Sequence, residues 1–246
     1  MKSSLSAQYR DLERWHWWFR GRQRIFETVL RNELAGRRNL RLASVGSGPA
    51  EGLAWLVPLA EPAGRVLGVD HDFRQAGKEQ RVDFVVGKAE SIPLAAGSFD
   101  AVLALDVLEH LDDDAGALRE AARLVAPGGL VLVTVPAFPS LWGLQDEVNE
   151  HRRRYTSHTL QQTFALAGLA HPRITYFNAF MLPPIAAVRW LRSFAGGADS
   201  ERSDFEDSRP GLTNDVLAAV FATERHLVPR MTLPLGVSLL ATLRAA

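Results

Sequence analysis

Residues 41–70 read RLASVGSGPAEGLAWLVPLAEPAGRVLGVD, and this stretch decides the fold. Its first apolar run, Arg41–Val45, is typical of a buried parallel strand. The run stops at residues that permit a tight turn and close backbone approach: Gly46, Ser47 and Gly48, here called the glycine turn. Residues 50–60 predict a helix, and a second apolar run, 65–69, ends at Asp70. This is the layout of a nucleotide-binding βαβ unit, in which an acid about 20 residues beyond the turn hydrogen-bonds the ribose.

Glycine turns follow strands in many folds, so this turn alone is weak evidence for a nucleotide-binding unit. Two later segments add to that evidence. Residues 98–111 read SFDAVLALDVLEHL, and residues 124–136 read LVAPGGLVLVTVP. With these motifs in this order, the chain resembles the class I S-adenosylmethionine-dependent methyltransferases. It is similar to the group with a "vlEHl" signature after the fourth strand and a "PGG" turn before the fifth. The resemblance covers about residues 15–169.

The resemblance implies an α/β fold, a Rossmann-like three-layer sandwich around a seven-stranded, mostly parallel sheet of order 3-2-1-4-5-7-6. A chain of 246 residues has room for one sizeable domain of this kind. We therefore expect a single domain over residues 1–246, with a helical cap (1–38), a core (39–177 and 234–246) and a helical lid insertion (178–233). The strands after the first two are expected at 82–86, 99–104, 130–135, 173–177 and 236–244.

Composition narrows the classes of partner. Lysine plus arginine and aspartate plus glutamate both number 28, so no overall basic field favours a nucleic acid. The absence of cysteine excludes a disulfide framework and a thiolate zinc site. Residues 1–10 lack the apolar core of a secretory signal, and no apolar run is long enough for a membrane span, so we expect a cytoplasmic protein. Asp112, Asp113 and Asp114 resemble a helix start, and no metal ligands are expected.

The resemblance implies S-adenosylmethionine as the cofactor, with its amino acid part against the glycine turn and its ribose at Asp70, beside His71. Asp106 ends the fourth strand and is expected at the methionine end of the cofactor. The chain departs from the family where Ser44 and Lys88 replace two usual acids. Lys88 cannot accept a hydrogen bond from the adenine amino group. Either Ala89 and Glu90 take over this contact, or adenine binding weakens.

A cluster of aromatic residues at 15–19, WHWWF, lies in a segment predicted to be helical over residues 3–34. These side chains could simply pack the helix against the domain. Three tryptophans within four positions cannot all face one core, however, because successive helical residues point about 100° apart. Some of them must line a pocket or an interface. In the family that the chain resembles, an N-terminal helical segment often closes over the methionine end of the cofactor. The resemblance thus implies Trp18 and Arg20 as candidate cofactor contacts, with Arg20 pairing the cofactor carboxylate.

The candidate catalytic residues lie mainly in residues 142–155, WGLQDEVNEHRRRY, which follow the fifth strand. The segment could be a solvated charged loop, but it also begins where the sheet opens toward the site. His151 is the preferred general base because the unperturbed pKa of histidine is near neutrality. His110 is the second choice, with a purely structural role as the alternative. Tyr155 and one arginine are expected to orient an anionic or hydroxylated acceptor.

The predicted function is methyl transfer to a small-molecule or lipid-like acceptor, with oxygen preferred and nitrogen or carbon left open. Two alternatives remain: a weakly catalytic or non-catalytic protein that binds S-adenosylmethionine or S-adenosylhomocysteine, and an NAD-dependent oxidoreductase. The insertion over 178–233 would form a lid, an acceptor tunnel or a peripheral membrane contact, which Arg189 and Arg192 would suit.

Overall fold

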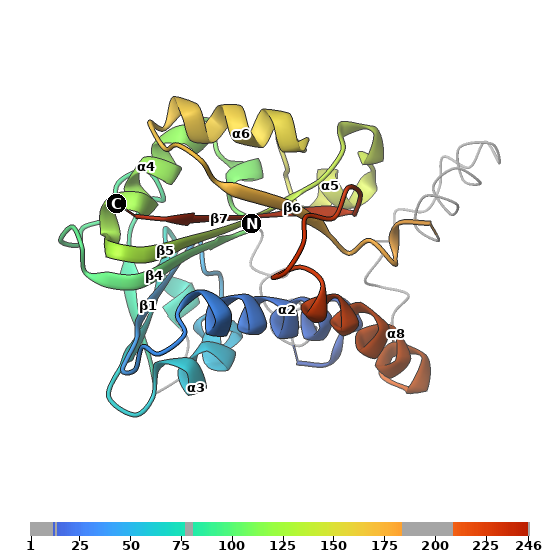
Figure 1. Ribbon diagram of the computed structural model, residues 1–246, viewed down its shortest axis with the longest axis horizontal. Coiled ribbons are helices and arrows are strands. Elements are labelled where there is room, and N and C mark those ends of the chain that lie inside the picture. Colours follow the sequence, from blue (N-terminus) through green and yellow to red (C-terminus); the bar gives the residue numbers. More distant parts are fainter. Residues whose placement is uncertain (1–11, 13, 77–80, 184–208, 246) are drawn as a thin grey trace.

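A computed structural model describes residues 12, 14–76, 81–183 and 209–245, and Figure 1 gives its arrangement. The predicted seven-stranded sheet is confirmed, in the order β3-β2-β1-β4-β5-β7-β6. The first part of the helix predicted over 3–34, before residue 12, and the arginines 189 and 192 of the insertion lie outside the described residues. The strands are β1 (Arg41–Val45), β2 (Arg65–Asp70), β3 (Val82–Val86), β4 (Phe99–Leu105), β5 (Val125–Pro136), β6 (Arg173–Phe177) and β7 (Ser238–Arg244).

The first five strands of the chain run parallel, and β7 is antiparallel to both β5 and β6. The carboxyl ends of β1, β2, β4 and β5 therefore open on one edge of the sheet, where ligands bind in folds of this type. Strand β5 begins at Val125, five residues earlier than expected, because Val125 pairs with Phe99 before the register shifts. The predicted turn at 127–129 thus lies inside β5, where Gly128 adopts a φ of 70°.

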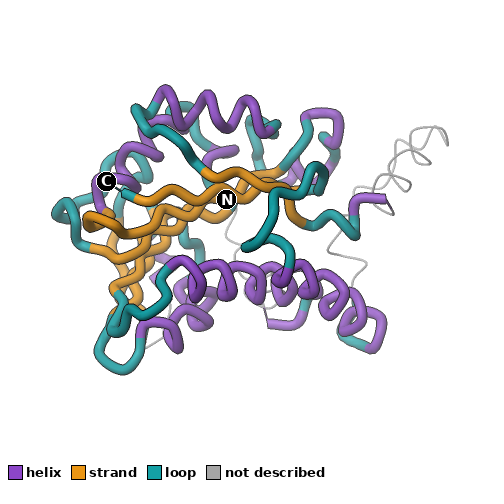
Figure 2. The backbone as a smooth tube through the Cα atoms, in the orientation of Figure 1, coloured by secondary structure: helices purple, strands orange, loops and turns teal. Residues whose placement is uncertain are grey.

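Helices cover both faces of the sheet and make the three predicted layers (Figures 1 and 2). Helices α4 and α6 cover one face, and α2, α3 and α8 cover the other. The helix predicted at 50–60 is a 3-10 helix followed by a short α-helix, because Pro58 cannot donate a backbone hydrogen bond. The α-helices are α2 (Trp17–Glu33), α3 (Val57–Ala60), α4 (Asp114–Leu124), α5 (Leu144–Val148), α6 (Ser157–Leu166) and α8 (Leu212–Ala222). The 3-10 helices span Ala50–Leu56, Phe73–Ala76, Leu108–His110, Pro139–Leu141 and Thr223–His226.

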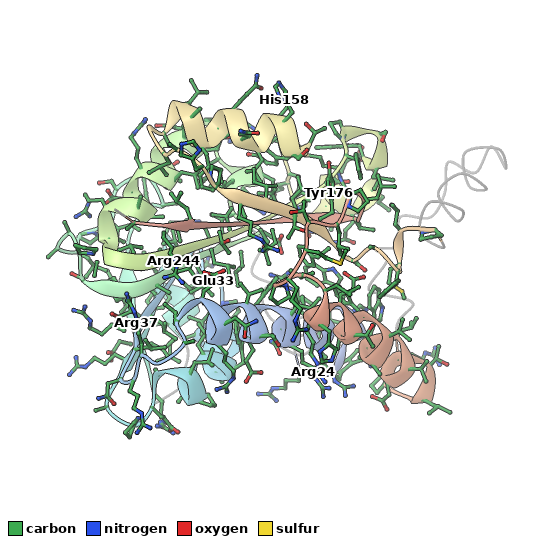
Figure 3. The ribbon with its side chains drawn as sticks, in the orientation of Figure 1. Arg24, Glu33, Arg37, His158, Tyr176 and Arg244 are labelled. Atoms are coloured by element: carbon green, nitrogen blue, oxygen red, sulfur yellow. The ribbon has the colours of Figure 1, made fainter. Side chains whose placement is uncertain are left out.

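Helices α2 and α8 pack tightly against each other beneath the sheet. A Cβ atom on Gly21 would lie 2.3 Å from Phe221 Cδ1, so only glycine permits this crossing. Asn214 on α8 accepts a hydrogen bond from Trp17 N at 2.8 Å and donates one to Trp15 O at 2.7 Å. At the far end of α2, Arg244 of β7 donates to Glu33 Oε2 at 3.0 Å (Figure 3). The amino-terminal helix is therefore fixed to the body of the domain at both ends.

The start of α2 provides a prediction about pH. His16 caps the helix through Nδ1, and burial lowers the pKa of its imidazole from 6.5 to about 4. As the pH falls from 6.5 to 4, the unfolded chain binds a proton before the folded one, so stability is lost over this range. We expect His16→Asn, which retains a capping oxygen, to reduce that loss by about 1–3 kcal/mol. Urea unfolding followed by circular dichroism at pH 7 and pH 4 measures the free energy of unfolding at each pH and hence the loss between them.

The control for this prediction is His158→Asn, because His158 is exposed at the start of α6. That variant should lose as much stability between pH 7 and pH 4 as the unaltered protein does. Equal losses in the His16→Asn and unaltered proteins would contradict the prediction.

Candidate active site

A cavity of about 790 Å³ opens at the carboxyl edge of the sheet, within the size range of small-molecule sites, about 300–1,000 Å³. It brings together every predicted site residue except Arg20 and Tyr155. The predicted residues that line it are Trp18, Gly46, Ser47, Gly48, Asp70, His71, Lys88, Ala89, Glu90, Asp106, His110 and His151. Segments from both ends of the chain thus share one site.

The glycine turn needs both of its glycines, for different reasons. Gly46 has a φ of 59°, and a Cβ atom there would lie 2.7 Å from Val107 Cγ2. Gly48 has a φ of 60°, but a Cβ atom there would meet nothing within 4 Å. Gly46 therefore permits close packing inside the protein, whereas Gly48 leaves open space beside the cavity for a ligand.

Asp70 connects the turn to the end of β2. One carboxylate oxygen accepts a hydrogen bond from Gly48 N at 3.0 Å, and the other accepts one from Asp72 N at 3.0 Å. The residue is only 9% exposed, which limits its movement. Because each carboxylate oxygen has more than one lone-pair site, Asp70 can still accept a hydrogen bond from a ligand hydroxyl.

Asp106 lies at the end of β4 in a left-handed conformation, with a φ of 54°. Thr134 fixes this conformation, because its backbone carbonyl accepts from Asp106 N at 3.0 Å and its hydroxyl donates to Asp106 Oδ1 at 3.1 Å. The other carboxylate oxygen, Oδ2, accepts a hydrogen bond from the guanidinium of Arg22 at 2.5 Å. Arg22 also lies over the Trp18 ring, 4.1 Å from its centroid. The cavity thus contains a half-buried ion pair next to the glycine turn.

Arg20, the arginine of α2 expected here, does not line the cavity, whereas Arg22 does. Arg20 pairs with Asp215 of α8 at the surface, and its side chain is 34% exposed. Residues two apart on a helix point in nearly opposite directions, whereas Trp18 and Arg22, four apart, share a face. The i, i+4 spacing from Trp18 could have identified Arg22 from the sequence alone.

Tyr155 also lies outside the cavity, contrary to expectation. It is 2% exposed, and its hydroxyl donates to Asp114 Oδ2 at 2.8 Å. Burial, followed by the neighbouring carboxylate, raises the pKa of Tyr155 well above its usual value. The backbone of Tyr155 bridges to Ala137, so the residue anchors the loop beneath the site.

His151 reaches the cavity as part of a hydrogen-bonded pair that the sequence analysis did not identify. Its Nδ1 lies 2.9 Å from Asp146 Oδ1, and Asp146 is fully buried. Asp146 also accepts from Arg154 Nε at 2.8 Å and from Gly143 N at 2.8 Å. Burial alone would raise the pKa of Asp146, but the bonds from His151 and Arg154 outweigh it and lower the pKa to about 2. The ionised carboxylate therefore keeps a proton on Nδ1 and leaves Nε2 as an acceptor.

Two further groups face His151. The His110 ring lies 4.8 Å from the His151 ring, centroid to centroid, and burial lowers the pKa of His110 to about 4. Glu109 is fully buried, with Oε1 4.0 Å from His151 Nε2. Burial, followed by repulsion from Asp106, raises the pKa of Glu109 well above its usual value. The acid adjacent to His110 was not selected from the sequence, although the "vlEHl" signature contains it.

The fold and this cavity define a Rossmann-like protein with a small-molecule site at the carboxyl edge of its sheet. The methyltransferase domain family matches residues 43–133. A probable S-adenosylmethionine-dependent methyltransferase of Mycobacterium tuberculosis is 30% identical over 201 residues, which are 76% of this chain and 71% of that protein. The chain belongs to the S-adenosylmethionine-dependent methyltransferases. S-adenosylmethionine is accordingly the cofactor, and the open space at Gly48 fits a ligand against the turn.

Several other curated relatives are matched over a smaller part of their length. A ubiquinone biosynthesis O-methyltransferase of Sinorhizobium medicae is 34% identical over 102 residues, 38% of this chain and 40% of that protein. The chain spans about half the length of two further curated relatives, 53% and 46%. A putative methyltransferase of Haloferax volcanii, solved with the Trm112 activator, shares the fold with a TM-score of 0.58 and 18% identity, over 98% of this chain and 94% of that one. Among the described residues, no helix combines the length and apolar character that crossing a membrane requires.

Proposed function

We propose that this protein transfers a methyl group from S-adenosylmethionine to a hydroxyl oxygen of a small-molecule or lipid-like acceptor, and that His151 accepts the hydroxyl proton. The single observation that carries this proposal is the Asp146–His151 pair, whose Nδ1–Oδ1 distance is 2.9 Å, on the cavity that contains the glycine turn. A histidine with one nitrogen held by a carboxylate has the other free to act as a base. The proposal deepens the family assignment by naming the acceptor atom and the base.

The cavity offers complementary groups to each part of the cofactor. Arg22 would take the carboxylate of the methionine part and Asp106 its ammonium, so the ion pair at 2.5 Å would open to admit opposite charges. Asp70 would accept a hydrogen bond from the ribose. Ala89 and Glu90 both line the cavity and would replace the acid that the family usually has near adenine.

The acceptor would occupy the part of the cavity formed by α2 and the ends of β6 and β7. Aromatic rings of Trp17 and Phe26 line it and suit an apolar or ring-shaped molecule. Asn178 and Ser238, which follow β6 and begin β7, add polar groups. Asn178 Oδ1 is buried without a hydrogen-bond partner among the described residues and could accept a hydrogen bond from the acceptor.

S-adenosylmethionine supplies the electrophilic methyl group on its sulfonium. The protein would hold the acceptor oxygen about 3–3.5 Å from that carbon, which is the main source of rate in such a displacement. The carbon–oxygen bond forms as the carbon–sulfur bond breaks, and the hydroxyl proton passes to His151 Nε2 and then to water. The name of the Sinorhizobium relative, an O-methyltransferase, also supports oxygen as the acceptor atom.

An acceptor screen tests this proposal. The protein is incubated with S-adenosylmethionine and phenols, catechols, aliphatic alcohols or primary amines, and S-adenosylhomocysteine and methylated products are measured by mass spectrometry. We expect O-methylated products from hydroxyl compounds. Products from amines alone would contradict the choice of oxygen. Calorimetric binding of S-adenosylmethionine without turnover of any acceptor would favour the binding-protein alternative, and tighter binding of NAD would favour the oxidoreductase.

A further inference from the structure

Three side chains with metal-ligating atoms converge at the wall of the cavity. A carboxylate oxygen of Glu109 and one ring nitrogen each from His110 and His151 all lie within 4.8 Å of one another. These residues come from the 3-10 helix after β4 and from the loop after α5. Two histidines and one carboxylate form a donor set typical of zinc and related divalent cations.

Glu109 provides an independent indication that the cluster binds a ligand. Its side chain is fully buried, and neither carboxylate oxygen has a hydrogen-bond partner among the described residues. A buried polar group without a partner is costly and needs an explanation, of which an absent ion is one. Glu109 is nevertheless one of the residues that line the cavity.

The two histidines are already oriented as metal ligands usually are. Metal-binding histidines typically donate a hydrogen bond from the N–H of their second ring nitrogen to a carboxylate or to a backbone carbonyl. His151 Nδ1 bonds to Asp146 at 2.9 Å, which directs Nε2 toward Glu109. The His110 ring hydrogen-bonds to the backbone of Glu150. Both supporting contacts are made by other residues of the protein, so the fold itself orients the two rings.

We propose that Glu109, His110 and His151 form a binding site for a divalent cation of the zinc type. Zinc bonds of about 2.0–2.1 Å in a tetrahedron place ligand atoms about 3.4 Å apart. The Glu109–His151 distance of 4.0 Å would shorten by about 0.6 Å, and no pair of the three ligand atoms, which all lie within 4.8 Å of one another, would shorten by more than about 1.4 Å. A tetrahedral ion held by these three residues would keep one further coordination position, which water or an acceptor oxygen could occupy.

The position of the cation also predicts its effect on the proposed reaction. His151 Nε2 has one lone pair, which cannot bind a cation and accept a proton at the same time. If methyl transfer uses His151 as proposed above, the bound cation inhibits it. The inhibition rests on that proposed function, whereas the binding site itself does not.

Calorimetric titration with Zn²⁺ alone, without cofactor or acceptor, tests the site. We expect one Zn²⁺ per chain, with at least tenfold weaker binding in Glu109→Gln and His110→Ala. Glu109→Gln keeps the size of the buried side chain, and melting temperatures verify that both variants are folded. The matched control is His158→Ala, because His158 lies on α6 (Figure 3) and does not line the cavity. Its affinity for Zn²⁺ should equal that of the unaltered protein.

Replacement of Zn²⁺ by Co²⁺ adds a spectroscopic readout, since visible absorption bands report the coordination geometry of the cobalt ion. Tetrahedral bands that disappear in folded Glu109→Gln and His110→Ala would support the site. Absence of binding, or binding that both variants retain, would overturn it while leaving methyl transfer by His151 intact. Binding accompanied by faster methyl transfer would overturn the inhibition and the base role of His151 together.

Discussion

Replacing Arg22 by alanine is expected to weaken S-adenosylmethionine binding about 10- to 100-fold, because a buried charge-assisted hydrogen bond contributes about 1.5–3 kcal/mol. Arg22 is 8% exposed and its guanidinium lies 2.5 Å from Asp106 inside the cavity. The cofactor carboxylate would lose its positive partner, and Asp106 would be left without a counter-charge. Arg22→Lys should recover only part of the affinity, because lysine cannot form the planar paired contact over Trp18.

Isothermal titration calorimetry with S-adenosylmethionine measures this effect. Arg20→Ala is the matched control, since it removes the same side chain two residues away, where the partner is Asp215 at the surface. Its affinity should stay within about twofold of the unaltered protein, as expected for an exposed ion pair. Equal losses in both variants would contradict the assignment of Arg22, and a larger loss in Arg20→Ala would restore the original prediction.

Replacing His151 by alanine is expected to lower kcat by about 100- to 10,000-fold, the usual contribution of a general base. Asp146→Asn should cause a smaller loss, because an amide can favour the wrong tautomer of His151 while leaving the ring in place. Neither change should alter the affinity for S-adenosylmethionine more than about twofold, since these side chains are proposed to act on the acceptor. The measurement is the rate of S-adenosylhomocysteine formation with a hydroxyl acceptor from the screen.

Two controls separate a base from a structural residue. Added imidazole should restore part of the turnover of His151→Ala, because it can enter the vacated space and accept the proton. His158→Ala should retain full turnover, because this exposed histidine lies on α6 and does not line the cavity. Folded His151→Ala protein with nearly unchanged turnover would show that His151 is not the base.

The strands and the glycine turn could be predicted because local sequence patterns encode them, whereas the strand order was an implication of the family resemblance. The apolar run Arg41–Val45 forms a buried strand, and the glycine turn is a local backbone requirement. The helix start at 112–114 likewise depends on local sequence, since the side chain of Asp113 caps α4 by accepting a hydrogen bond from Gly116 N at 2.7 Å. The start of β5 could not be predicted from local sequence, because it depends on the pairing of Val125 with Phe99 of β4.

The sequence by itself thus determined the parallel sheet, the position of the glycine turn, Asp70 at the end of β2 and the candidate histidines. Each of these features follows from residue type and from spacing within a short stretch of sequence. Only the tertiary structure decided that Arg22 rather than Arg20 faces Asp106, that Tyr155 is turned away, and that Asp146 and Glu109 face His151. The physical reason is that such contacts depend on how separate helices and loops pack, which fixes the direction of each side chain over distances that no local pattern specifies.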